Sequence, residues 1–173
     1  MIMRRFLVIG GMLATLTALA AGLAVSADAS NATITLTAGA LAISAPSTSV
    51  SLGSSSVSNG SITISGSLGV VSISDQRGVT TPWTASVIST AFTPTAGPAI
   101  PASAVSYAAG VLTQSAGVVA TAVAASDLTG VSTVVTGVPT GVSSVSWNPT
   151  ITIVVPPNFA PGTYAATITH SVA

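Results

Sequence analysis

The sequence predicts an all-β protein: a single-domain antiparallel β-sandwich that follows an N-terminal signal helix. Aliphatic and hydroxyl residues alternate over many short runs, as they do in strands with one buried face. Glycine (16 residues) and proline (10 residues) separate these runs at short intervals. Many short strands with frequent turns are typical of sandwiches and barrels. Charged side chains make up only 3% of the chain, so hydroxyl groups must hydrate its surface.

The start of the sequence predicts export from the cell. Two arginines precede an uncharged apolar run at 6–24, and small residues follow at 25–27. We therefore expect a signal peptide at 1–27 and a mature domain at 28–173. Two alternatives are cleavage after Ala29 and retention as a membrane anchor, because the run approaches the roughly 20 residues that span a bilayer.

Period-2 alternation locates the strands. It is clearest in four runs, at residues 33–37, 41–43, 61–65 and 150–155. Their β-branched Ile, Val and Thr side chains suit a pleated sheet. The alanine-rich stretch 118–125 keeps the alternation at Val119, Thr121 and Val123 and lacks helix caps, so we expect a strand there too. The serine-rich stretch 44–61 predicts a loose loop, with a weak strand as the alternative.

Composition limits the partners. After cleavage at the predicted site, one arginine faces three aspartates, so electrostatic attraction would not draw the protein to nucleic acid. The sequence has no cysteine, so stability must come from packing and from the hydrogen bonds of the sheets. The sequence has no lysine to prevent edge-to-edge pairing of strands, so self-association between copies is a possible outcome. Membrane contact is expected only through an uncleaved signal segment.

The residues for catalysis or cofactor binding are missing. His170 is the only histidine and neither cysteine nor glutamate occurs, so no side chains complete a zinc site of three or four ligands. The sequence contains no G-x-S-x-G elbow and no glycine-rich phosphate loop. We therefore predict a protein that is not an enzyme and that binds no cofactor or metal.

Two segments carry a family resemblance. Residues 71–93 contain V-S-I-S-D-Q-R-G and then P-W-T-A-S-V; residues 147–172 contain V-V-P and then A-P-G-T-Y-A-A-T-I-T-H-S-V. In order, spacing and residue type they resemble the WxL domain, a family of exported Gram-positive proteins that attach non-covalently to the cell wall. The likeness runs from about residue 41 to the C-terminus. At the signature sites Trp83-Thr84-Ala85 and His170-Ser171-Val172 replace Trp-x-Leu, which is similar to diverged, actinobacterial members.

The resemblance and the uncharged surface together imply a site for peptidoglycan or an attached glycan. The candidates for sugar contact are Trp147, Trp83, Tyr164 and His170. Trp147 is the first choice, because it starts a strand and is expected to be partly exposed. Trp83 is expected in the core, with a sugar-stacking platform as the alternative. His170 shares the apolar face of the last strand with Tyr164, which predicts a half-buried neutral imidazole bonded to backbone, or else a ligand contact.

Three further residues are predicted to shape a loop. Asp75 and Arg77 stand two residues apart, immediately before Gly78, and form the only oppositely charged pair of the predicted mature chain. We expect an ion pair or an Asp-turn that fixes this loop.

The predicted protein is secreted and extracellular, at the cell wall or cell surface, where it binds peptidoglycan or attached glycan without a covalent bond. The alternative is a structural subunit of a surface filament or layer, whose edges at 32–36 and 162–172 pair between copies by strand addition. A third interpretation is an accessory adhesin that acts with other surface proteins.

Overall fold

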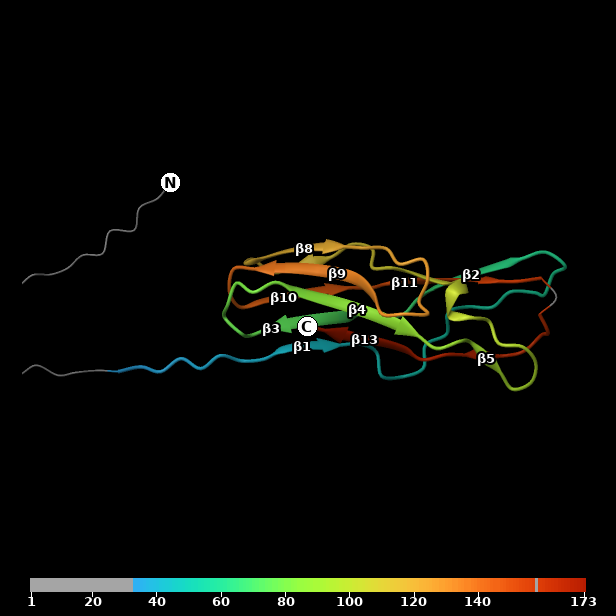
Figure 1. Ribbon diagram of the computed structural model, residues 1–173, viewed down its shortest axis with the longest axis horizontal. Helices are drawn as coiled ribbons and strands as arrows, with labels where there is room; N and C mark the ends of the chain where they lie inside the picture. Colours follow the sequence, from blue (N-terminus) through green and yellow to red (C-terminus); the bar gives the residue numbers. More distant parts are fainter. Residues whose placement is uncertain (1–32, 158) are drawn as a thin grey trace, which may run out of the picture. The chain divides into compact units, whose positions relative to one another are not determined.

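The computed structural model describes residues 33–157 and 159–173, and these residues form an all-β fold (Figure 1). Within these ranges there is no α-helix, and a single 3-10 turn covers Ala102–Ala104. The chain divides into two units, Met1–Thr35 and Leu36–Ala173, and every strand assigned among the described residues belongs to the second. The predicted all-β class is confirmed, whereas the predicted signal helix at 1–27 lies outside the described residues.

The strands form antiparallel sheets. The first sheet has the order β1-β3-β10-β7, with β1 at Leu41–Ser44, β3 at Val71–Asp75, β10 at Ser143–Trp147 and β7 at Thr113–Gln114. The second has the order β2-β11-β6, with β2 at Ile62–Ser67, β11 at Thr150–Val155 and β6 at Val105–Ala108. The third has the order β13-β4-β9-β8, with β13 at Ile168–Val172, β4 at Trp83–Ser89, β9 at Ser132–Pro139 and β8 at Val118–Ala122. A short fourth sheet pairs β12, Tyr164–Ala165, with β5, Thr93–Pro94.

The first and second sheets share one long antiparallel ladder. β2 leads into β3 and β10 leads into β11, so Trp147 pairs with Val71 and, after a break, Thr150 pairs with Ser67. The Leu68 amide donates to the Pro149 carbonyl across that break at 3.0 Å. β1 pairs with β3 but ends at Ser44, so β2 remains an outer strand of its sheet.

The core follows from strand alternation. β4 buries every second residue, with Trp83, Ala85 and Val87 inward and the hydroxyl residues between them half-buried. These side chains belong to one buried apolar cluster that also takes residues from the first and second sheets. Each large aliphatic side chain buried in this way contributes about 1.5–3 kcal/mol to folding.

A β-bulge in β9 adds to the core. Ala85 pairs with Val135 and Ser86 pairs with Thr133, which leaves Val134 as an extra residue between them. Both Val134 and Val135 are therefore fully buried, although adjacent residues of a regular strand point to opposite faces.

Most of the predicted strands are present. The runs at 41–43, 61–65 and 150–155 correspond to β1, β2 and β11, and the alanine-rich stretch contains β8, so these predictions are confirmed. The serine-rich stretch between β1 and β2 has no strand, as expected of a loop. The predicted strand at 33–37 is wrong, because these residues have no regular structure and their side chains are exposed.

Candidate functional site

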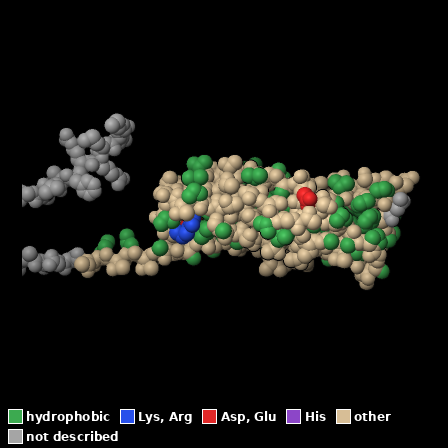
Figure 2. All heavy atoms as spheres, in the orientation of Figure 1, with side chains coloured by type: hydrophobic (Ala, Val, Ile, Leu, Met, Phe, Trp, Pro, Cys, Tyr) green, Lys and Arg blue, Asp and Glu red, His purple; other side chains and the backbone are tan. Residues whose placement is uncertain are grey.

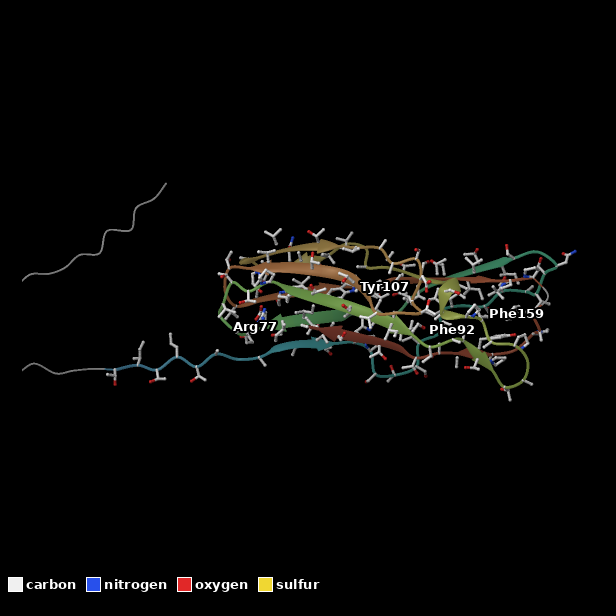
Figure 3. All side chains as sticks on the ribbon, viewed as in Figure 1. Arg77, Phe92, Tyr107 and Phe159 are labelled. Atoms are coloured by element: carbon white, nitrogen blue, oxygen red, sulfur yellow. The ribbon has the colours of Figure 1, made fainter. Side chains whose placement is uncertain are left out.

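A groove with a volume of about 1110 Å³ lies at the end of the domain that carries β2, β5 and β12. Most of its lining comes from the serine-rich segment 45–58, the half-buried face of β2, and residues 159–168 with His170. Phe92 reaches it from the segment after β4, and Phe159 from the segment after β11 (Figure 3). The groove therefore combines an apolar floor with a rim of serine and threonine hydroxyls.

Two predicted candidates, Tyr164 and His170, line this groove. They lie on the half-buried face of the C-terminal segment, where residues 164, 166, 168, 170 and 172 alternate with exposed neighbours. The predicted shared face is thus confirmed. This face adjoins the core, because β13 pairs with β4 and His170 lies opposite the buried Val87.

Tyr164 forms part of an aromatic pair. Its ring centroid lies 6.2 Å from that of Phe159, and the two planes are tilted by 48°. Its hydroxyl donates to the Ala160 carbonyl at 2.9 Å, which fixes the ring against the segment 159–163. Both rings are half-buried and line the groove, so together they offer an apolar surface of the kind on which a sugar ring can pack.

His170 ends a buried hydrogen-bond chain. The Trp147 indole Nε1 donates to the Tyr107 hydroxyl oxygen at 2.7 Å, and that oxygen lies 3.2 Å from His170 Nε2. The Tyr107 and His170 rings meet edge to face, with centroids 5.7 Å apart. The expected backbone partner of His170 is therefore replaced by the Tyr107 side chain, which sequence reasoning had not singled out.

Burial disfavours the charged forms of Tyr107 and His170. Burial raises the pKa of Tyr107 to about 12, although the hydrogen bond from Trp147 lowers it by a smaller amount. Burial also lowers the pKa of His170 below 6.5. If the Tyr107 hydroxyl donates this hydrogen bond to Nε2, the neutral imidazole carries its own proton on Nδ1. That buried Nδ1 has no hydrogen-bond partner among the described residues.

The two tryptophans lie inside the domain. Trp147 is only 3% exposed, so the prediction that it is partly exposed is wrong. Its burial depends on Tyr107, which stands on another strand and accepts its N–H. Trp83 is 2% exposed, which confirms the core interpretation. Neither ring has a free face on which a sugar could stack.

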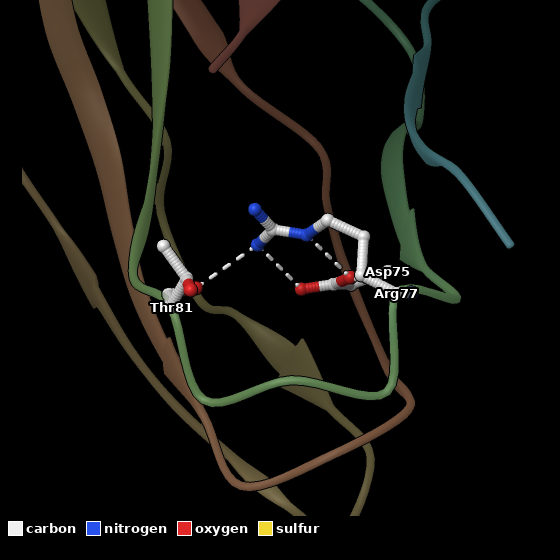
Figure 4. Close-up of polar contacts among 3 residues, drawn as sticks. All are labelled: Asp75, Arg77 and Thr81. Atoms are coloured by element: carbon white, nitrogen blue, oxygen red, sulfur yellow. Dashed lines mark hydrogen bonds and ion pairs between the residues drawn. The ribbon is translucent and has the colours of Figure 1, made fainter. Parts of the chain in front are cut away.

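The charged loop lies in another part of the domain, between β3 and β4 (Figure 4). The Asp75 carboxylate accepts hydrogen bonds from the Arg77 backbone N–H at 3.1 Å, from Nε at 2.9 Å and from Nη2 at 2.9 Å. Arg77 Nη2 also donates to the Thr81 carbonyl at 3.0 Å. Asp75 is 1% exposed, and the hydrogen bonds from Arg77 hold its pKa below the usual 3.8 despite this burial.

These contacts hold Asp75 and Arg77 together at the start of the loop, which is the arrangement that the predicted loop-structuring role needs. The ion pair and the Asp-turn occur together, because the same Asp75 oxygen accepts from the Arg77 backbone and side chain. Gly78 has φ of +68°, in the left-handed region that favours glycine. The loop fixes the crossing of the chain from the first sheet to the third and has no part in the groove.

Charged side chains are scarce on the described surface, as the face in Figure 2 illustrates. The charged residues of the described ranges are Asp75, Arg77 and Asp127. The same ranges contain no cluster of three or more His, Cys, Asp or Glu residues that could hold a metal ion. They also contain no helix with the length and apolar character needed to cross a membrane.

No protein-family model matches the sequence, and comparisons with curated proteins and with solved structures find no match either.

Proposed function

We propose that this chain is an exported, single-domain β-sandwich of the cell surface that attaches non-covalently to a neutral glycan of the cell wall. The observation that carries the proposal is the groove, which has an aromatic pair, a hydroxyl rim and no charged residue in its lining. Polyhydroxylated, uncharged ligands are recognised by such a combination of hydrogen bonds and apolar packing. The near absence of ionisable groups on the described residues favours attachment over chemistry.

The family resemblance supports this proposal through the placement of its two segments. The first contains β3 and β4, and the second contains β11, β12 and β13. β4 pairs directly with β13, so the two segments are hydrogen-bonded neighbours, with Ala85 opposite Val172. The two segments therefore contribute neighbouring strands to one sheet.

A sedimentation assay tests glycan attachment. The exported protein is mixed with isolated cell-wall sacculi, pelleted, and challenged with free muropeptides. We expect sedimentation that muropeptides block, and Tyr164→Ala should weaken it roughly 3- to 10-fold through loss of the aromatic surface. Tyr164→Phe retains the ring and loses only the bond to Ala160, so it should bind like the parent chain. Binding that is unchanged in Tyr164→Ala, or absent in the parent chain, would contradict this use of the groove.

A second candidate function, a subunit of a surface filament or layer, is supported by a different observation. β1 and β13 are both outer strands of their sheets, and so is β2. The described residues contain no lysine to guard these edges. Assembly would appear as polymers of the purified protein without any wall present.

A further inference from the structure

The N-terminal arm, residues 33–38, has the character of a strand without a partner. Its sequence is T-I-T-L-T-A, and the side chains of Ile34 and Leu36 are 88% and 90% exposed. The described backbone pairing begins only at the next residue, where the Gly39 amide donates to the Gln76 carbonyl at 2.8 Å. Two large aliphatic side chains at strand spacing are thus left in water, which costs free energy that pairing would recover.

The outer edge of β2 is a site for an added strand. β1 follows β3 for four residues, and the chain then continues as the segment 45–58. This segment lies against β2 where Leu52 meets Gly66, but it forms no strand, so no described strand continues β1 alongside β2. Ile62 and Ile64 of β2 point into the groove, while Thr63 and Ser65 point outward. An edge with unpaired backbone groups beside an apolar groove accepts an extended segment by strand addition.

The arm and the edge match in pattern. The arm reads T-I-T-L-T over 33–37, and β2 with its preceding residue reads S-I-T-I-S over 61–65. An antiparallel pairing centred on Thr35 and Thr63 would place Ile34 and Leu36 beside Ile64 and Ile62, facing the groove. The threonines would then continue the hydrated outer face. Like-charge repulsion would not oppose this contact, since neither strand carries a charge.

The attachment point of the arm, at Gly39, and the groove lie at different ends of the unit Leu36–Ala173. The arm joins the sheet beside Gln76, next to the Arg77 loop, whereas Phe92 and Phe159 mark the groove at the other end (Figure 3). A contact between two different surfaces leaves a free arm and a free groove on the resulting pair. Such a head-to-tail contact can continue as an open chain of copies.

From the unpaired arm, the open β2 edge and their matching patterns, we propose that the arm of one copy adds as a strand to the β2 edge of the next copy. Ile34 and Leu36 of the arm would then enter the groove of that copy. The bound occupant is a second copy of this chain. The proposal rests on the second candidate function, the surface subunit, and not on glycan binding. It uses the groove that the glycan would occupy, so the arm and a glycan would compete for it.

Cysteine crosslinking tests the register, since the natural chain has no cysteine. Exported protein carrying Thr35→Cys is mixed with exported protein carrying Thr63→Cys and oxidised. We expect a disulfide-linked dimer of the two different copies. Thr35→Cys mixed with Thr121→Cys is the matched control, because Thr121 is an exposed threonine on the outer strand β8. Equal crosslinking in the control, or crosslinking to Ser171→Cys on β13 in place of Thr63→Cys, would overturn the assignment to β2.

Two charge substitutions test which face of the arm is buried. Leu36→Asp places a carboxylate in the groove and should weaken assembly in analytical ultracentrifugation by roughly 100-fold or more. Thr37→Asp adds the same charge to the outward face and should change assembly by less than about 3-fold. A parent chain that stays monomeric at millimolar concentration would overturn the proposal, and so would equal effects of the two variants. Leu36→Asp is expected not to assemble and leaves the groove free, so its sedimentation with sacculi reports glycan binding separately.

Discussion

Gly137 faces Trp83 across the third sheet, and the indole ring occupies the space where a side chain would stand. A Cβ atom at this position would overlap the Cε2 and Cζ2 atoms of Trp83. No such contact is possible, so the ring or the strand would have to move. The sequence shows a glycine within a strand but does not reveal that a tryptophan about fifty positions earlier requires it.

Gly137→Ala is therefore expected to destabilise the domain by about 1–3 kcal/mol, the usual cost of overpacking a core. Gly130→Ala is the control, because a Cβ atom there meets nothing within 4 Å. Urea unfolding of both variants measures the difference. Equal midpoints would show that the core accommodates the added methyl group.

His170 makes stability depend on pH. Burial lowers its pKa in the folded protein, while the unfolded chain keeps the ordinary value of 6.5. Between these two values the unfolded state binds more protons, so stability is constant above pH 6.5 and falls as the pH drops below it. The slope for one proton is at most about 1.4 kcal/mol per pH unit. Thermal melts between pH 8 and pH 5 should show this fall, and His170→Gln should remove it.

At the scale of elements, the sequence predicts strands well where their partners are in the same chain. β2 and β11 combine alternation with close turns, and each finds a neighbour in the second sheet. The arm has the same alternation but no partner within the described residues, so the predicted strand is missing. Alternation indicates a segment that can pair; it does not say with which chain.

The site was predictable in part for a related reason. The contacts of Asp75 and Arg77 join residues two apart, so sequence spacing alone predicts them. Trp147 and Tyr107 are 40 residues apart, and their contact depends on how β10 and β6 are placed. The predicted exposure of Trp147 is therefore wrong, because it depends on a distant contact. The predicted alternation around His170 is correct, because it depends only on neighbouring residues of one strand.

The loop between β3 and β4 yields a prediction at this scale. Asp75→Ala leaves the donors of Arg77 without their buried acceptor, and we expect a loss of about 2 kcal/mol in the free energy of unfolding. Asp127→Ala is the matched control, because Asp127 is exposed and accepts from Thr129 in a similar turn. The stabilisation by Asp75 should be present above its ordinary pKa of 3.8 and be lost as the pH falls through its lower folded pKa. Chemical unfolding of both variants at pH 7 and pH 3 checks this.

At the scale of the whole molecule, the described residues carry too few charges to attract a partner electrostatically. Asp75 and Arg77 neutralise each other within the loop, which leaves Asp127 as the one charged side chain outside an ion pair in the described ranges. Association with a wall glycan or with a second copy must therefore rest on hydrogen bonds and apolar burial. Neither of these is screened by dissolved ions in the way that charge pairs are.

Both kinds of association should consequently resist salt. Raising sodium chloride from about 0.05 M to about 1 M shortens the screening length from roughly 14 Å to 3 Å, yet sacculus binding and polymer mass should change by less than about 2-fold. Ammonium sulfate should strengthen the assembly of copies, because sulfate favours burial of apolar surface such as Ile34 and Leu36. Sedimentation at each salt concentration measures both effects. A steep loss of binding with sodium chloride would mean that charges outside the described residues hold the protein to its partner.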